Sequence, residues 1–286
     1  MSPEIALEYI NAAKSAKYSI SGEFSGGENQ GAYRVVNAND GKTAVLKYSA
    51  NPMWKSQIER AKAATDHLRP LGYPVPTYQY IDATGTGTFW LEDELPGQAI
   101  ETPSTDQVNE LLALIELQKG QTISAVQGQD WSWYAMGVVF RGDGGLVRYL
   151  MQFSTETSAL AAQIEGMVLG LDGKALGNSD LVHGDFGISQ VLAQDQKISA
   201  VLDWDQAGYG DRAMDLVSLW YSLMDVPASR DQVFTALVKN SDPESIKIFA
   251  AYKMLAIVAW HINTPGGQVA TVAQQAKTAL QILHTL

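Results

Sequence analysis

The hydrophobic pattern of this chain changes close to the tripeptide Leu95-Pro96-Gly97, and this change constrains the possible fold strongly. Before it, apolar residues mostly alternate as in β-strands, whereas beyond residue 100 they recur mostly at helical spacings of three and four. A Leu-Pro-Gly sequence is typical of a hinge between structural units. We therefore predict an α+β fold with a small β-rich N-terminal lobe (residues 1–95) and a larger, mostly helical C-terminal lobe (residues 96–286).

The expected elements can be placed by residue range. In the N-terminal lobe they are a short helix at 4–16, β-like runs at 19–38 and 42–49, an amphipathic helix at 53–68, and two strands within 75–95. Apart from the first helix, the order is therefore β, β, helix, β, β. In the C-terminal lobe we predict helices at 105–120, 155–171, 229–240, 242–263 and 268–283, with short β-like pieces at 190–194 and 198–204.

The composition excludes several classes of protein. The 286 residues are 46% hydrophobic and 18% charged, as in a folded domain, and the formal charge of -11 argues against a nucleic-acid partner. Cysteine is absent, which excludes disulfides and thiol catalysis, and the four histidines lack zinc-ligand spacing. No export signal or long apolar run is evident, so we expect a cytoplasmic protein with no membrane partner.

Three familiar sequence motifs are incomplete or absent. Gly41-Lys42-Thr43 ends like a phosphate-binding P-loop, but Val36 stands where that loop needs a glycine. Gly85-Thr86-Gly87 lacks the third glycine of a dinucleotide loop, and a strand follows it rather than a helix. No G-x-S-x-G sequence supports a serine hydrolase.

The stretch from residue 181 to residue 216 places six aspartates in 36 positions, beside apolar runs. Burial of a charge costs free energy, and proteins tolerate this cost mainly where a metal, a partner or a reaction needs the charge. Asp185 in a loop could offer a carboxylate to a hydroxyl substrate, and Asp203 at a strand end could offer one to a metal. Lys47 lies in an earlier strand and Glu59 on the helix that follows it. A strand lysine tied to a helix glutamate, a loop aspartate and a metal-binding aspartate are the parts of a kinase-type site.

The order and spacing of these residues resemble the aminoglycoside phosphotransferase and choline kinase-like family. That family has a catalytic loop H-G-D-x-x-x-x-N and a metal motif I/L-D-W-x, commonly followed by A-G-x-G-D-x-x-x-D-L. This chain reads HGDFGISQ at 183–190 and LDWDQAGYGDRAMDL at 202–216. Weaker matches are GGENQGAYRV, YPVP and LPG, and the resemblance covers roughly residues 20–225.

The resemblance implies a bilobal protein-kinase-like fold with a nucleotide-binding N-lobe and a catalytic, acceptor-binding C-lobe. It implies that Asp185 orients or deprotonates the attacking hydroxyl, and that Asp203 ligates Mg²⁺. Lys47 would contact the nucleotide phosphates and pair with Glu59.

Further residues take implied roles of three kinds. The turn over the phosphates would use the backbone of Ser25, Gly26, Gly27 and Asn29, and the backbone from Asp93 to Leu95 would meet the adenine. His183 and Asp215 would brace the catalytic loop. Asp205 and Asp211 would either face the substrate or hold local turns, and Trp131–Tyr134 would either line the acceptor pocket or pack in the core.

One position departs from the family pattern. The second metal ligand of the loop is Asn in the family and Gln190 here, so its carbonyl lies one methylene further out. Mg²⁺ tolerates little change in ligand geometry, which leaves the number of metal ions open.

Three functions are consistent with these features. The first is an ATP- or GTP- and Mg²⁺-dependent kinase acting on a hydroxyl of an aminoglycoside-like or other antibiotic. The second is a kinase of another small alcohol, such as a macrolide, choline, homoserine or a sugar-like metabolite. The third is a non-catalytic nucleotide-binding pseudokinase, suggested by Gln190. The acceptor, the choice between ATP and GTP, and the oligomeric state stay open at this stage.

Overall fold

The computed structural model describes residues 2–24 and 31–286 and divides into two compact units. The N-unit runs to Gln98 and also contains Val191–Ala207, whereas the C-unit comprises Ala99–Gln190 and Gly208–Leu286. The sequence-based boundary at residue 95 lies close to the first division. It did not anticipate that residues 191–207 fold with the N-terminal part of the chain.

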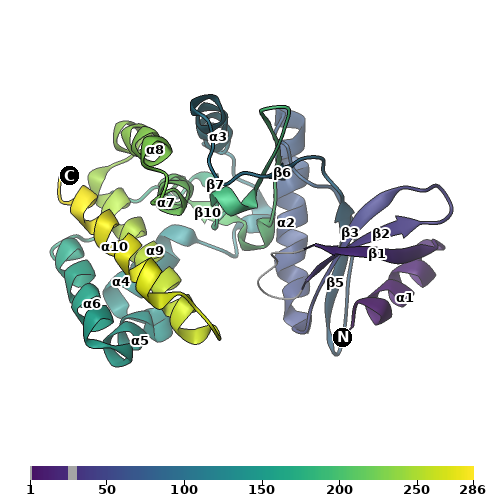
Figure 1. The fold of residues 1–286 in the computed structure, drawn as a ribbon, viewed down its shortest axis with the longest axis horizontal. Helices are drawn as coiled ribbons and strands as arrows, with labels where there is room; N and C mark the ends of the chain where they lie inside the picture. Colours follow the sequence, from purple (N-terminus) through teal and green to yellow (C-terminus); the bar gives the residue numbers. More distant parts are fainter. Residues whose placement is uncertain (1, 25–30) are drawn as a thin grey trace. The chain divides into compact units, whose positions relative to one another are not determined.

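The N-unit is built on an antiparallel sheet, which among the described residues has five strands in the order β1-β2-β3-β5-β4 (Figure 1). The strands are β1 (Tyr18–Phe24), β2 (Ala32–Asn37), β3 (Thr43–Ser49), β4 (Tyr78–Thr84) and β5 (Gly87–Asp93); the helices are α1 (Pro3–Lys14), η1 (Pro52–Trp54), α2 (Lys55–Leu68) and η2 (Arg69–Leu71). The predicted order β, β, helix, β, β is therefore one strand short. The run at 19–38 is two strands, because β1 and β2 pair with each other antiparallel.

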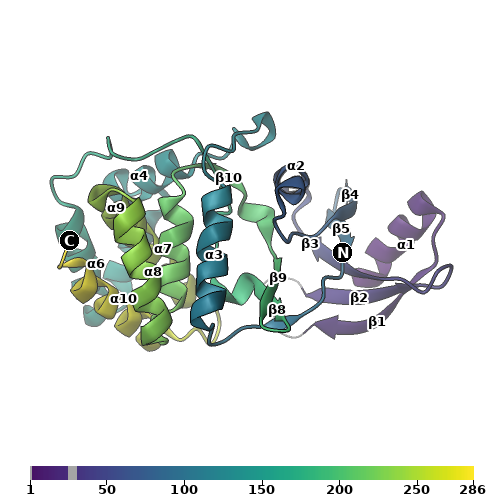
Figure 2. The ribbon, with the colours of Figure 1, turned by 90° about the horizontal axis from the view of Figure 1, so that it is seen from above.

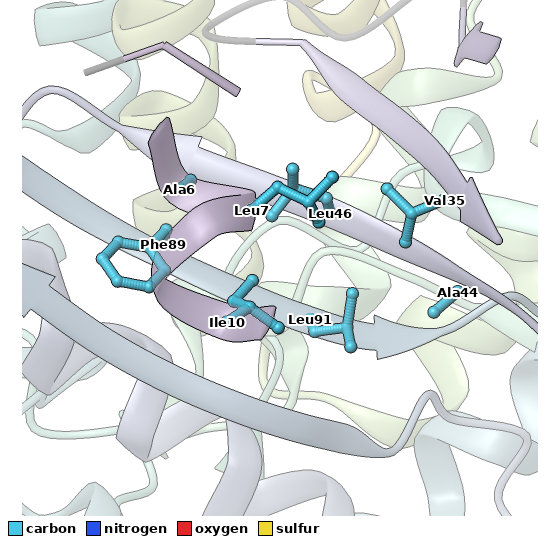
Figure 3. Packing of buried hydrophobic residues seen from close by; sticks show 8 residues of the cluster. All are labelled: Ala6, Leu7, Ile10, Val35, Ala44, Leu46, Phe89 and Leu91. Atoms are coloured by element: carbon cyan, nitrogen blue, oxygen red, sulfur yellow. The ribbon is translucent and has the colours of Figure 1, made fainter. Parts of the chain in front are cut away.

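One face of this sheet carries a hydrophobic core under α1 (Figure 3). The helix begins after Ser2, whose side chain accepts a hydrogen bond from Ile5 N–H, and it contributes Leu7 and Ile10 to the core. The sheet contributes Val35, Ala44, Leu46, Phe89 and Leu91. Because side chains alternate along a strand, Val45 and Lys47 point to the opposite face.

The hairpin of β8 (Val191–Gln194) and β9 (Lys197–Val201) belongs to the N-unit because hydrogen bonds tie it there. The Val201 N–H donates to Pro74 O at 2.8 Å, and the Ser199 hydroxyl donates to Pro96 O at 2.6 Å. The short η6 (Trp204–Gln206) follows, and the Trp204 ring meets Tyr73 edge-on at 5.4 Å. β6 (Gln98–Ala99) completes the order β6-β8-β9.

The C-unit is mostly helical. Its helices are α3 (Thr105–Leu117), α4 (Trp131–Arg141), α5 (Leu146–Phe153), α6 (Thr155–Val168), α7 (Ala213–Ser222), α8 (Pro227–Asn240), α9 (Pro243–Asn263) and α10 (Val269–Leu283), with the short turns η3 (Ser124–Val126), η4 (Asp143–Gly145) and η5 (Ile188–Gln190). Strands β7 (Asp180–Val182) and β10 (Gly208–Gly210) pair antiparallel.

The predicted helices are confirmed within a few residues of their ends. Three helices were not predicted: α4, α5 and α7. In α7 every residue from Ala213 to Tyr221 is buried, so no amphipathic period exists to be read.

Helix α9 lies at the centre of this unit. It contacts α4, α5, α6, α7 and α10, and it runs beside α10 in Figure 1. Figure 2 shows α8 next to α3 and α7 on another side of the unit. By length and composition α9 could span a membrane, with a mean hydropathy of 1.3 in its most apolar window, but 61% of that window is buried inside the protein. These are the properties of a core helix.

Gly97 in the predicted hinge is required by close packing. Its φ is +125°, and an added Cβ would lie 2.3 Å from Ser199 Oγ and 2.9 Å from Ala193 O. We expect Gly97→Ala to lower the free energy of unfolding by about 1–3 kcal/mol, because the backbone carbonyl of Ala193 cannot turn aside. Chemical denaturation measures this. Gly85→Ala, where nothing lies within 4 Å, is the control, and an equal loss in both variants would contradict the argument.

Candidate functional site

A lysine between two carboxylates marks the functional face of the N-unit sheet. Lys47 Nζ lies 2.8 Å from Glu92 Oε1 and 2.6 Å from Asp203 Oδ1. The sheet register explains the first contact, because Lys47 is opposite Trp90 and Val45 is opposite Glu92, which makes Lys47 and Glu92 diagonal neighbours on one face. Asp203 reaches the same ammonium from the loop after β9.

The cluster keeps the lysine charged. Burial by itself lowers the pKa of Lys47, but the charges of Glu92 and Asp203 outweigh this and hold that pKa well above its ordinary value. Burial raises the pKa of the Glu92 carboxyl, and the Lys47 ammonium opposes the rise. Lys47 is therefore a protonated ammonium held between two carboxylates, and it is the member of this cluster that can contact anionic groups such as phosphate oxygens.

The predicted pairing of Lys47 with Glu59 is wrong in this structure. Glu59 is exposed on α2, and Glu92 on β5 takes the place expected for it. The physical reason is strand register, which places Glu92 beside the lysine without any contribution from the helix. A signal was present in the sequence, since Glu92 follows the apolar run Phe89-Trp90-Leu91 in a strand.

Asp203 sits in a conformation that only a few residue types adopt readily. Its φ is 57° and its ψ is 56°, in the left-handed region that Asp tolerates better than most residues. The next residue fixes this turn, because the buried Trp204 ring donates from Nε1 to Val201 O at 3.0 Å. Strained backbone of this kind persists where surrounding packing imposes it, and it is common at functional sites.

The N-unit offers one half-exposed carboxylate to a metal ion. Among the residues that the structure describes, no group of three His, Cys, Asp or Glu side chains could hold a metal ion. The Asp203 side chain, 49% exposed, offers a hard carboxylate oxygen. Mg²⁺ is commonly bound by one or two carboxylates together with substrate phosphates and water, so Asp203 suits it. Gln190, the other predicted ligand, ends η5 in the C-unit.

The residues predicted to meet the adenine lie at the end of β5. Asp93 accepts a hydrogen bond from Gln79 Nε2 at 2.7 Å, and Leu95 helps to line an open depression of about 380 Å³. Arg34, Thr43, Glu94 and Pro96 line the rest of it. The predicted phosphate-turn residues Ser25, Gly26, Gly27 and Asn29 lie outside the described residues.

In the C-unit, one buried carboxylate braces the loop that carries Asp185. Asp215 accepts the backbone N–H groups of His183 at 2.7 Å and Gly184 at 2.9 Å. Gln118 Nε2 donates to the same carboxylate at 2.8 Å, and His183 Nδ1 accepts the Asp185 N–H at 3.3 Å. These contacts are those expected of the bracing residues His183 and Asp215, and Gln118 is an additional member that the sequence did not reveal.

Burial raises the pKa of Asp215, and the neighbouring His183 together with the hydrogen bonds from His183, Gly184 and Gln118 opposes the rise. Buried polar groups are tolerated when they are hydrogen-bonded, and this carboxylate accepts three donors. The burial of Asp215 thus has a structural reason, because its carboxylate holds the backbone of the loop.

The Asp185 side chain has an ion-pair partner that sequence analysis missed. Lys253 Nζ, from the middle of α9, lies 2.6 Å from Asp185 Oδ1. Lys253 is only 9% exposed, whereas the Asp185 side chain is 50% exposed. A lysine inside the apolar run of α9 was the available signal, because buried lysines are rare unless they are paired.

The two ambiguous aspartates differ in what they contact. Asp211 accepts the N–H groups of Ala213 at 2.9 Å and Gly177 at 3.0 Å, so it holds local turns. Asp205 faces Arg60 of α2: burial lowers the pKa of the Arg60 guanidinium, and the Asp205 charge opposes this.

The aromatic segment Trp131–Tyr134 is divided between the core and the surface. Trp131 is 3% exposed and packs in the core, whereas Trp133 is 58% and Tyr134 39% exposed. Tyr134 meets Tyr252 of α9 edge-on at 5.8 Å.

A strand lysine paired with carboxylates on one unit, and a braced loop aspartate on the other, are residue types that kinase-type phosphotransferases use. A sequence model described as the phosphotransferase enzyme family (APH) matches residues 22–249. The chain belongs to this family.

Solved structures agree on the fold. The crystal structure of aminoglycoside phosphotransferase APH(4)-Ia has a TM-score of 0.70 at 16% identity, over 97% of this chain and 98% of that one. Macrolide 2'-phosphotransferase MphH from Brachybacterium faecium has a TM-score of 0.61 at 19% identity, over 96% and 97%. Choline kinase LicA from Streptococcus pneumoniae has a TM-score of 0.68 at 15% identity, over 98% of both chains. No curated protein sequence matches.

The expected family and fold are thus confirmed: a β-sheet N-terminal region and a helical C-terminal region as in the kinase-like phosphotransferases. The protein is an enzyme, a phosphotransferase with an alcohol group as acceptor.

The brace on the catalytic loop can be tested by removing its charge. In Asp215→Asn one amide oxygen replaces a carboxylate that accepts three donors, so we expect a loss of about 1–3 kcal/mol in the free energy of unfolding. We also expect kcat to fall while KM for the nucleotide changes little. Urea denaturation and steady-state kinetics measure these effects. Asp231→Asn on the surface of α8 is the control, and identical behaviour of the two variants would refute the brace.

Proposed function

We propose that this phosphotransferase moves the γ-phosphoryl group of ATP or GTP to a hydroxyl of a small molecule, with Mg²⁺ as the cofactor. The observation that carries the proposal is the Lys47 ammonium, held by Glu92 and Asp203 on the sheet face. Such a cluster has little use in a protein that binds only neutral ligands, because the burial of Lys47 and Glu92 desolvates two charges.

Each group has a definite task in this reaction. Lys47 binds nucleotide phosphate oxygens, and Glu92 keeps its ammonium in position. Asp203 supplies the carboxylate for magnesium, which when bound neutralises charge on the phosphates. Asp185 accepts a hydrogen bond from the acceptor hydroxyl and orients its oxygen for attack. An ordinary aspartate is a weak base, but a loose phosphoryl-transfer transition state needs mainly positioning.

The relatives support a nucleotide as the donor. Thermostable mutants of APH(4)-Ia have been crystallised with ADP and hygromycin B, and with AMP-PNP and hygromycin B. We extend the nucleotide part to this chain, because the fold is shared and Lys47 and Asp203 supply the ammonium and the carboxylate that a nucleotide and its magnesium ion require. We place the reaction in the cytoplasm, where nucleoside triphosphates are available.

The acceptor is a small alcohol. Aminoglycoside-like and other antibiotics are the first candidates; a macrolide, choline, homoserine or a sugar-like metabolite is the alternative. The related enzymes act on acceptors of three of these kinds by name. A pseudokinase remains the contrasting proposal, and it predicts nucleotide binding without transfer.

Removal of the loop carboxylate tests the reaction directly. We expect wild-type protein with ATP or GTP and Mg²⁺ to phosphorylate at least one member of a panel of antibiotics and metabolic alcohols. Asp185→Ala should reduce this transfer by about a hundredfold or more, because the hydroxyl loses its orienting partner. Coupled nucleotide turnover and mass spectrometry of the acceptor measure it.

Thermal stabilisation by nucleotide, with and without EDTA, is the control for this experiment. It should persist in Asp185→Ala and disappear without magnesium. Equal, slow nucleotide hydrolysis by both proteins with every acceptor would favour the pseudokinase.

Gln190 allows a separate test of the metal. We expect Gln190→Asn to keep or raise activity, because the shorter side chain restores the amide position that the family loop uses for Mg²⁺. Initial rates at several magnesium concentrations measure this. A loss of more than about tenfold, 1.4 kcal/mol in transition-state stabilisation, would show that this loop is adapted to the longer side chain.

A further inference from the structure

The ion pair of Asp185 and Lys253 lies entirely within the C-unit and alters the chemistry expected at the catalytic loop. Lys253 Nζ is 2.6 Å from Asp185 Oδ1, which is a short, charge-assisted contact. The lysine is nearly buried in α9, whereas the carboxylate is half exposed. Packing of α9 against α4, α5, α6, α7 and α10 therefore fixes the cation, and the cation in turn restrains the half-exposed carboxylate.

This pair changes the charge that an acceptor meets. A lone carboxylate attracts cationic groups on the acceptor, whereas a carboxylate paired with an ammonium has almost no net charge. A hydroxyl that is hydrogen-bonded to Asp185 lies a few ångströms from the Lys253 ammonium, at a distance where like charges repel strongly in a partly desolvated site. An ammonium group on a carbon next to the reactive hydroxyl is therefore disfavoured.

The surroundings of the pair are aromatic. Tyr252, next to Lys253 on α9, meets Trp131 at 5.9 Å and Tyr134 at 5.8 Å between ring centroids. Burial raises the pKa of the Tyr252 hydroxyl far above its ordinary value, with contributions from Tyr134 and from the negative charge of Asp185. The phenol is thus neutral, and Tyr134 presents a partly exposed ring. Such rings offer a large rigid apolar surface with a polar tip.

We infer that Lys253 is a positioning and specificity-determining residue: it holds Asp185 in place and selects acceptors whose reactive hydroxyl has no neighbouring ammonium group. This inference rests on the proposed role of Asp185 in phosphoryl transfer. It narrows the acceptor to an alcohol without an ammonium group beside the reactive hydroxyl, such as a neutral, sugar-like alcohol, because the C-unit places a fixed cation at the loop where the hydroxyl must bind.

Acceptor pairs with and without an ammonium group test the selectivity. Choline is compared with its uncharged carbon analogue 3,3-dimethylbutan-1-ol, and glucosamine with glucose, at saturating ATP and Mg²⁺. In wild-type protein we expect kcat/KM to be at least about tenfold higher for the neutral member of a pair. Lys253→Met should lower this ratio of kcat/KM values by about tenfold, to near one or below it. Lys253→Arg should retain the wild-type ratio. A wild-type preference for the cationic member, or a ratio that Lys253→Met leaves unchanged, overturns the inference.

The positioning role has its own kinetic signature. With a neutral acceptor, Lys253→Met should lower kcat by about tenfold or more while KM for ATP stays unchanged, and Lys253→Arg should restore most of the loss. The control is Lys277→Met, which breaks a surface ion pair with Glu156 in the same unit and should leave both parameters unchanged.

A double-mutant cycle in stability separates failure of this inference from failure of the proposed function. Asp185→Asn leaves the buried Lys253 ammonium without its charge partner, so we expect a lower denaturation midpoint. Adding Lys253→Met should recover about half of that loss or more, whether or not the protein turns over an acceptor. Strictly additive effects would overturn the inference. Coupling without transfer to any acceptor would support the ion pair and defeat the proposed reaction.

Discussion

Desolvation of charge governs this structure, and the cluster of Lys47, Glu92 and Asp203 is its main instance. Three ionised groups close to one another are tolerated only if their mutual attraction offsets the loss of water. The antiparallel register of β3 and β5 supplies Glu92, and the tight turn before Trp204 supplies Asp203. The N-unit thereby holds a protonated lysine at a fixed position on one face of the sheet, while α1 and the apolar core take up the other face.

The C-unit meets the same constraint by two different means. Asp215 is compensated mainly by hydrogen bonds, because two loop N–H groups and Gln118 donate to it. Asp185 is compensated by a full opposite charge on Lys253. The first arrangement shapes the backbone of the loop, and the second holds its functional side chain. Asp215, with its three hydrogen-bond donors, is fully buried, whereas the ion pair leaves the Asp185 side chain half exposed.

Prediction from sequence succeeded where information is local and failed where distant segments meet. The loop at 183–190 and the strand end at Asp203 were recognisable because their residues lie close together in the chain. Glu59 was assigned wrongly and Glu92 was overlooked, since the choice between them depends on strand register. Lys253 is 68 positions from Asp185 along the chain, and no local pattern connects them. The helix α7 was missed because complete burial removes the periodicity on which helix prediction depends.

The sequence by itself determined the family, the β-rich and helical division, and the positions of Asp185 and Asp203, because spacing along the chain encodes loops and strand ends directly. The tertiary structure decided which charges meet. It joined residues 191–207 to the N-terminal sheet, gave Lys47 its true carboxylate partners, and brought α9 to the catalytic loop. Those contacts follow from packing and register over long separations, which the order of residues does not specify on its own.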